Sequence, residues 1–316
     1  MPLPPVRSNG MSGIRTIVLR NPVDAAWGLA LEEAILRLLG EGKSEATVIA
    51  WRAHPAVIVG VNPETLKEVD LQAVGGLGVR LIRRESGGGA VYLDPGCLIY
   101  SVIVPRRSVP EEAEERYKML SAGVADLLRG MGLEPEFRDL GVWVRGFKVS
   151  GTAQSMLHGG LLHHGTLLVS TDLEALNAVI ARPKAPVANV SDLLGQEADP
   201  AELLSPLVER VALSLGLQPR RGEFAPGEVR LAESLLPKYC RRDLEPLEVY
   251  CGASSDGSVR VHLLVGREGP IGAIVDSGGR VEWLDCPQAR EAGGAVAEAI
   301  ERALTSDPRS GRVRPL

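Results

Sequence analysis

Three consecutive glycines beside two arginines make the densest cluster of chemically suggestive residues in the chain. Residues 83–92 read Arg-Arg-Glu-Ser-Gly-Gly-Gly-Ala-Val-Tyr and lie between two strand-like runs. Because such glycines weaken regular structure, they indicate a backbone that must approach another group closely. Their N–H groups can form an anion-binding concavity, and arginines beside it can hold phosphate bidentately. The alternative is a hairpin turn with two surface arginines, and no Walker or GxGxxG fingerprint is present.

A second segment places one lysine among small residues. Residues 146–154 read Gly-Phe-Lys-Val-Ser-Gly-Thr-Ala-Gln. The small neighbours of Lys148 leave space for a ligand, and its ammonium is a mobile point charge. The alternative is a surface lysine on a strand.

A third segment, residues 161–168, reads Leu-Leu-His-His-Gly-Thr-Leu-Leu. Strand alternation predicts that one of the two histidines, His163 and His164, points inward and the other outward. A metal site needs further ligands, and no third one lies nearby in the sequence, which favours a histidine packed in the core.

These segments need a framework of helices and strands to bring them together. Apolar residues at helical spacing predict helices over residues 24–39, 110–131, 172–181 and 200–215. Pro110 suits a first helical position, and the acidic residues after it complement the helix dipole. Short β-branched runs predict strands over residues 47–51, 56–59, 79–82, 90–92, 98–104, 142–150 and 161–169.

The end of the chain reads as a separate, smaller unit. Residues 217–228 are rich in Pro, Gly and Arg and predict a linker. Beyond it we expect a helix at 228–237, three or four strands between 246 and 284, and a helix at 288–303. The expected division is a flexible N-terminus (1–14), a catalytic domain (15–222), a small α+β accessory domain (223–304) and a flexible tail (305–316).

Composition excludes several classes of protein. With 316 residues, 45% of them hydrophobic and 24% charged, the chain is an ordinary globular protein of about two domains. A net charge of −5, scattered arginine pairs and only 4% aromatic residues argue against nucleic-acid binding. No apolar run predicts a membrane span or a secretory segment, and the four cysteines form no CxxC pair. We therefore expect a cytoplasmic protein with reduced thiols.

The order and spacing of the three segments resemble the lipoate–protein ligase A family of the biotin/lipoyl ligase superfamily. The matching motifs stand at 83–92, 146–153 and 163–168, and residues 29–33 are similar to the family's first helix. The resemblance covers about residues 15–220 and implies an α/β fold, with helices packed on a mixed β-sheet. Lys238 and Tyr239 resemble the start of the family's small C-terminal domain.

The resemblance also implies a chemistry. Such ligases join lipoate to ATP as lipoyl-adenylate, then pass the acyl group to a lysine of a lipoyl domain. Lys148 would bridge the lipoyl carboxylate and the α-phosphate, and Mg²⁺ would accompany ATP. The implied nucleotide-binding residues are Arg84, Gly89, Ala90, Val91, Tyr92 and Lys148. The implied lipoate-binding residues are Ser86, Gly87, Gly88, Lys148, His164, Gly165 and Thr166. An apolar tunnel for the dithiolane is expected near Val57 to Val59 and Leu167.

The chain departs from the family pattern at several positions. Leu93 stands where His is usual, and Cys97 and Ile99 stand where Asn is usual. Leu140 and Gly141 replace an Asn-Asp pair that helps to place the metal and phosphates. Asp139 is the candidate that would substitute for it through a shifted loop.

Two other functions remain open on the sequence. An octanoyltransferase or lipoyl amidotransferase would need a nucleophilic cysteine. The resemblance would place that cysteine within residues 132–147 or 170–200, and both ranges contain none. Cys97 lies closest to the glycines, and a small buried hydrophobe is its ordinary role. A noncatalytic lipoyl-carrier binding protein is the third reading, whereas biotin ligation lacks its Gly-Arg-Gly-Arg loop. The expected partners are lipoyl-domain acceptors: 2-oxoacid dehydrogenase E2 subunits, or a glycine cleavage H-type protein.

Overall fold

The computed structural model describes residues 12–181 and 185–240, and the backbone of four further strands between 250 and 284. The first strand begins at Gly13, inside the segment expected to be flexible. The helix expected at 288–303 and the tail at 305–316 lie outside the described residues. No helix in the described part of the chain is long and apolar enough to cross a membrane.

An eight-stranded mixed sheet forms the centre of the molecule, which confirms the predicted α/β class. Its strand order is β11-β1-β2-β6-β10-β9-β8-β7. β1 runs parallel to both β2 and β11, whereas the remaining pairs are antiparallel. The strands are β1 (Gly13–Val18), β2 (Thr47–Arg52), β6 (Cys97–Pro105), β7 (Pro135–Arg138), β8 (Gly141–Val144), β9 (Phe147–Leu157), β10 (Gly160–Leu168) and β11 (Gln218–Arg221).

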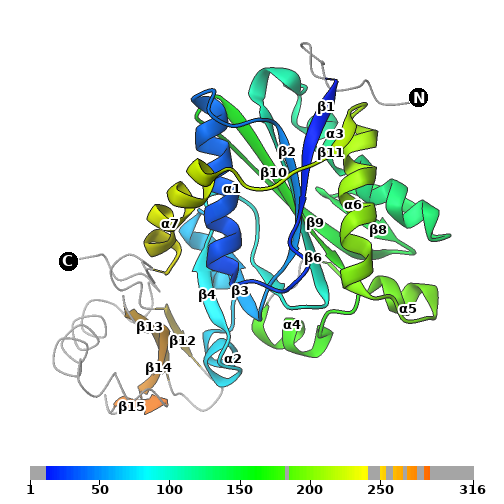
Figure 1. Cartoon of the computed structure of the whole chain (residues 1–316). Helices are drawn as coiled ribbons and strands as arrows, with labels where there is room; N and C mark the ends of the chain where they lie inside the picture. The colour runs from blue at the N-terminus through cyan, green and yellow to red at the C-terminus, as the bar shows by residue number, and fades with distance from the viewer. Residues whose placement is uncertain are drawn as a thin grey trace.

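Helices cover both faces of this sheet and create two hydrophobic cores (Figure 1). On one face lies α1 (Ala25–Gly40), with α7 (Pro226–Cys240) packed against it. On the other face lie α3 (Ala113–Gly130) and α6 (Pro200–Ser214), which pack against each other. The central strands are therefore buried on both sides. The short helices α4 (Leu173–Val179) and α5 (Val190–Leu194) follow β10.

A small three-stranded sheet carries the glycine-rich segment. Its order is β4-β3-β5, where β3 is Ala56–Val59, β4 is Arg80–Arg83 and β5 is Val91–Leu93. Residues 84–90, called the glycine loop below, connect β4 to β5 across β3. The segment between β3 and β4 contains a 3-10 helix, η1 (Pro63–Glu68), and α2 (Leu71–Gly76).

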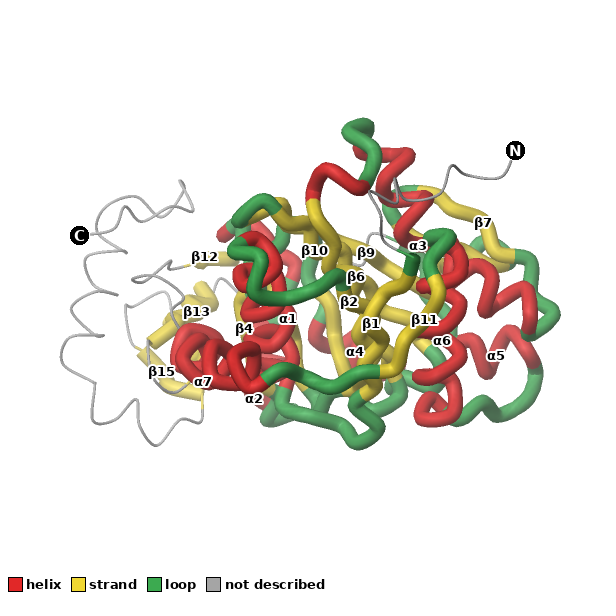
Figure 2. The backbone as a smooth tube through the Cα atoms, turned by 45° about the horizontal axis from the view of Figure 1, so that its top comes forward, coloured by secondary structure: helices red, strands yellow, loops and turns green. Residues whose placement is uncertain are grey.

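Four antiparallel strands form a third sheet near the C-terminus. They are β12 (Tyr250–Ala253), β13 (Val259–Val265), β14 (Gly269–Val275) and β15 (Val281–Leu284). β14 lies beside α2 (Figure 1), and Figure 2 shows β12, β13 and β15 of the same sheet from a second direction. This sheet agrees with the three or four strands expected in this region.

Three local predictions are wrong for identifiable reasons. The helix expected from residue 110 begins at Ala113, because the Glu112 carboxylate accepts hydrogen bonds from the next N–H groups and caps the helix. The single strand expected over 142–150 is two strands, because Arg145 and Gly146 both have positive φ and form a tight hairpin turn. The expected linker contains β11, which pairs with β1 at the sheet edge.

Candidate active site

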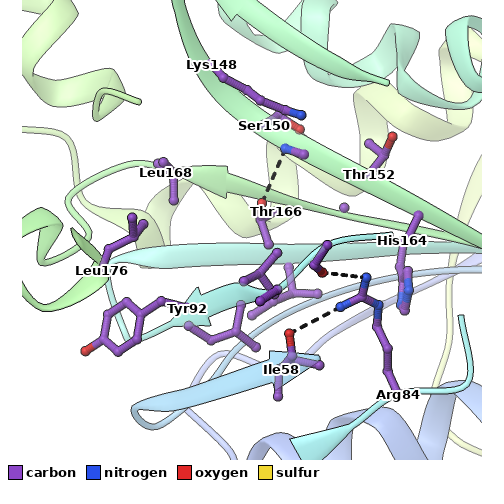
Figure 3. A pocket seen from close by; sticks show the side chains of 18 of the residues that line it. Ile58, Arg84, Tyr92, Lys148, Ser150, Thr152, His164, Thr166, Leu168 and Leu176 are labelled. Carbon is purple, nitrogen blue, oxygen red and sulfur yellow. Dashed lines mark hydrogen bonds between the residues drawn. The ribbon is translucent and has the colours of Figure 1, made fainter. Parts of the chain in front are cut away.

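One cavity of about 240 Å³ gathers most of the residues singled out by the sequence. It lies between strands β9 and β10 of the main sheet, the glycine loop and α1. Figure 3 shows Lys148 and Arg84 on opposite sides of the residues that line it. The predicted site residues among the lining are Arg84, Gly89, Ala90, Val91, Tyr92, Lys148, His164, Gly165 and Thr166. Ser86, Gly87 and Gly88 belong to the loop but are not among the lining residues.

Arg84 holds the glycine loop in shape from within. Its guanidinium donates to the Ser86 hydroxyl at 2.8 Å, to the Ile58 carbonyl at 3.3 Å, and to the carbonyls of Gly87 and Gly89 at 2.5 and 2.9 Å. The residue is only 5% exposed, and this burial lowers its pKa to about 10. Most of its donors are therefore used by the loop itself, and phosphate binding by Arg84 stays a prediction.

A carboxylate already occupies one N–H group of the loop. Glu68, the last residue of η1, accepts a hydrogen bond from the Ala90 N–H at 2.8 Å. Glu68 also lines the cavity. The Ala90 N–H therefore donates to an anionic oxygen of the protein itself.

Lys148 sits near the start of β9, against a strained turn. Its Nζ donates to the Asp139 carbonyl at 3.2 Å. Asp139 and Leu140 form the β7–β8 turn, and both have positive φ, which is costly for residues other than glycine. The next residue must be small, because a Cβ on Gly141 would lie 2.4 Å from the backbone carbonyl oxygen of Ser150, and it would also lie 2.5 Å from the Lys148 Cε. The turn therefore places the lysine by backbone shape.

The metal role predicted for Asp139 is not supported by its surroundings. Its carboxylate is 71% exposed and lies 3.4 Å from the Arg138 Nε, so it pairs with a cation instead. Among the described residues, no group of three or more His, Cys, Asp or Glu side chains could hold a metal ion. These residues do not fit a protein-held Mg²⁺ site, and ATP phosphates are the ordinary alternative ligands for that ion.

His164 is fixed at both ring nitrogens by a buried hydrogen-bond chain. Nδ1 lies 2.8 Å from Glu32 on α1, and Nε2 lies 2.6 Å from the Ser86 hydroxyl. Glu32 also accepts hydrogen bonds from Trp51 and Ser101. The chain thus ties β10 and α1 to the glycine loop, and it makes the imidazole a rigid wall of the cavity.

His163 lies on the opposite face of β10, and it is buried as well. The expectation that one histidine would point outward is wrong, because α3 covers that face of the sheet. Its ring nitrogens lie near Gln154 at 3.1 Å, Tyr100 at 3.3 Å and Ser121 at 3.4 Å. Burial, with the neighbouring His164 and Arg116 charges, lowers the pKa of His163 to about 3. It is a neutral core residue.

The apolar lining of the cavity includes Ile58, the middle residue of the expected range Val57 to Val59, but in the other strand it lies one residue beyond the expected Leu167. Ile58 and Leu168 line the cavity, whereas Val57, Val59 and Leu167 do not. Adjacent residues of a strand face opposite sides, and Leu167 belongs to the core beneath α3 and α6. The remaining apolar lining includes Trp51, Ile99, Leu176 and Ile180.

Cys97 is not placed to act as a nucleophile. It is buried in the core beneath α1, at the start of β6, and does not line the cavity. Burial and the nearby Asp94 carboxylate raise the pKa of its thiol well above the usual value. A thiolate is therefore disfavoured at this position.

Sequence reasoning missed two cavity carboxylates, Glu32 and Glu68. A signal for Glu32 was present: residues 25–36 of α1 are apolar except for Glu32 and Glu33, and both are buried. Buried carboxylates require partners, so an acidic pair inside an apolar helix indicates specific contacts. Glu68 lies in a polar stretch and had no comparable signal.

This site and fold match one family of enzymes. Residues 24–212 match the model of the lipoyl protein ligase A/B catalytic domain, which spans more than half of the chain. The chain belongs to this family, whose members include both lipoate–protein ligases and octanoyltransferases.

Relatives of both kinds are similar to this chain. It is 30% identical to lipoate-protein ligase A subunit 1 of Thermoplasma acidophilum, over 71% of this chain and 92% of the relative. It is 28% identical to octanoyltransferase LipM of Kyrpidia tusciae, over 68% of this chain and 92% of the relative. A probable lipoate-protein ligase A of Mycoplasma pneumoniae is 33% identical, but the match spans 52% of this chain and only 48% of that relative.

Solved structures show the same fold. A putative lipoate protein ligase from T. acidophilum with bound lipoic acid superposes with a TM-score of 0.63 at 30% identity, covering 72% of this chain and 95% of that chain. A lipoate-protein ligase A bound with ATP gives the same TM-score, identity and coverage. A bipartite ligase from T. acidophilum is described together with its E2 lipoyl domain, again at a TM-score of 0.63.

Proposed function

We propose that this protein is an ATP-dependent lipoate–protein ligase that activates lipoate or octanoate as acyl-AMP and transfers the acyl group to a lipoyl-domain lysine. The observation that carries the proposal is a cavity that has Lys148 and the glycine loop on opposite sides, beside an apolar lining. A carboxylate and a triphosphate are both anions, so their reaction needs positive charge and oriented N–H groups where they meet. The structures of relatives with lipoic acid and with ATP support the same assignment.

Each residue has a defined task in this mechanism. The carboxylate oxygen of lipoate attacks the α-phosphorus, the bond to the β-phosphate oxygen breaks, and pyrophosphate leaves. Lys148 holds the two reacting anions together, and the backbone from Gly89 to Tyr92 accommodates the nucleotide. His164 and the apolar lining orient the acyl chain. The acceptor lysine amine then attacks the acyl carbonyl, AMP leaves, and the amine proton passes to solvent.

An octanoyltransferase is the second candidate, because relatives of that name match over most of their length. That reaction passes through a thioester on a cysteine. Among the described residues no cysteine lines the cavity, and Cys97 is buried away from it. We therefore favour the ligase. The proposed acceptors are lipoyl domains of E2 subunits or H-type proteins, and the strands β12–β15 belong to the proposed accessory domain.

Mass spectrometry of an apo lipoyl domain separates these functions. The protein is incubated with the domain and either lipoate, ATP and Mg²⁺, or an octanoyl-carrier donor without ATP. The ligase predicts a lipoyl mass gain only in the first mixture. A gain only in the second mixture identifies a transferase, and no gain in either identifies a binding protein.

A further inference from the structure

The last turn of α7 reaches the outer side of the glycine loop. The Lys238 Nζ lies 2.5 Å from the Glu85 carboxylate in the loop. The same ammonium donates to both carboxylate oxygens of Glu33 on α1, at 3.0 and 2.9 Å. One side chain from the C-terminal part of the chain therefore joins α1 to the loop that borders the cavity.

The contact to Glu33 is a firm anchor. The Glu33 side chain is only 4% exposed, and Tyr239, the neighbour of Lys238, donates to it at 2.5 Å. Burial alone would raise the pKa of Glu33, but the hydrogen bonds from Tyr239 and Lys238 hold this pKa below its ordinary value. Arg37 provides a further contact to this carboxylate. The ammonium is thus held at one end and presents its remaining donor capacity to Glu85.

Glu85 lies between two residues whose contacts fix the conformation of the glycine loop. It stands between Arg84, whose guanidinium binds the loop carbonyls, and Ser86, whose hydroxyl binds His164. Glu68 holds the far end of the loop at Ala90. Glycines offer no side chains with which to fix a conformation, so such a loop depends on these contacts for its shape.

We propose that Lys238 is a positioning residue for the glycine loop, so that α7, beyond the predicted catalytic domain, sets the geometry of ATP binding. The expected effect of Lys238 on the KM for ATP rests on the proposed function, whereas its effect on the conformation of the glycine loop does not. Lys238 does not line the cavity and acts through Glu85. Of the loop, Arg84, Gly89 and Ala90, which are assigned to ATP, line the cavity, whereas Ser86 to Gly88 do not. Loss of Lys238 therefore weakens ATP binding more than lipoate binding.

Charge removal with a matched control tests the proposal in the full-length protein. Lys238→Met keeps the aliphatic stem and removes the ammonium, and Lys238→Arg restores a cation. Lys118→Met is the control, since Lys118 is similarly exposed and forms an ion pair with Glu114 on the surface of α3. We expect Lys238→Met to raise the KM for ATP in lipoyl-adenylate formation about tenfold, with the KM for lipoate unchanged and partial rescue by Lys238→Arg.

Hydrogen–deuterium exchange of residues 83–92 provides a readout that does not need activity. Lys238→Met and Glu85→Gln are expected to speed exchange in the loop, and the double variant to add little to either. Lys118→Met leaves exchange unchanged. Unaltered loop exchange in a folded Lys238→Met variant, or equal changes in the KM of ATP and lipoate, overturns the proposal. If the wild-type protein forms no adenylate, the proposed function fails, while the exchange comparison still decides the role of Lys238.

Discussion

Lys148 carries the charge on which the proposed chemistry depends. Its ammonium donates a hydrogen bond to the carbonyl of Asp139, in a turn where Asp139 and Leu140 both have positive φ. We expect Lys148→Ala to lower lipoate-dependent exchange of pyrophosphate into ATP by about 100-fold or more, because one preorganised donor at the reacting charge is lost. The melting temperature should stay close to that of the wild type. Exchange above a tenth of the wild-type rate would mean that another group bridges the two anions.

Cys97, in contrast to Lys148, should be dispensable for activity. Its thiol is buried, and its pKa is raised by burial, so a ligase has no use for it as a nucleophile. Cys97→Ala should retain acyl transfer to the lipoyl domain within about threefold, with a modest loss of stability from the small cavity. Transfer should be followed by mass spectrometry at a temperature where the variant is folded. Complete loss of transfer in a folded variant would favour the thioester route.

Among the elements, α7 is joined to the sheet by a buried ion pair. Arg15 on β1 contacts Glu228 in the first turn of α7 at 2.6 Å, and both side chains are buried. We expect Glu228→Ala to lower the free energy of unfolding by about 3 kcal/mol or more, because it removes the buried carboxylate that pairs with the buried Arg15 charge at 2.6 Å.

Glu45 supplies the control for that variant. It also contacts Arg15, but at 3.8 Å and with half of its side chain exposed. Glu45→Ala should therefore cost less than about 1 kcal/mol in a denaturant titration. Equal losses in the free energy of unfolding for Glu45→Ala and Glu228→Ala would show that burial does not strengthen the Arg15–Glu228 ion pair.

His163, on the central strand β10, should make the stability of the folded protein depend on pH. In the folded protein this histidine stays neutral down to about pH 3, whereas the unfolded chain takes up the proton below the ordinary value of 6.5. The unfolded state thus binds one more proton between these values, and stability falls as pH falls, by about 1.4 kcal/mol per pH unit.

His163→Gln removes this contribution, so the comparison of the two proteins isolates it. Unfolding titrations at several values between pH 6.5 and pH 4 should show a shallower pH dependence for the variant. Parallel stability curves would mean that His163 is protonated in the folded protein, in conflict with its buried position.

For the molecule as a whole, the sequence indicated the α/β class and most strands, because apolar periodicity reports burial directly. It also indicated Lys148 and the glycine loop, because runs of small residues beside a cation are rare and local. It did not indicate the partners of Glu32 and Glu68, since these contacts join segments far apart in the chain. The linker prediction failed because residues 218–221 form a strand by pairing with β1 rather than by their own propensity.

The central claim is that a lipoate carboxylate oxygen attacks the α-phosphate of ATP in this cavity. Lipoate labelled with oxygen-18 in its carboxylate tests this directly, with the AMP released during lipoyl-domain modification analysed by mass spectrometry. Adenylation predicts one heavy oxygen in the AMP. Unlabelled AMP, or acylation of the domain without AMP release, would contradict the account.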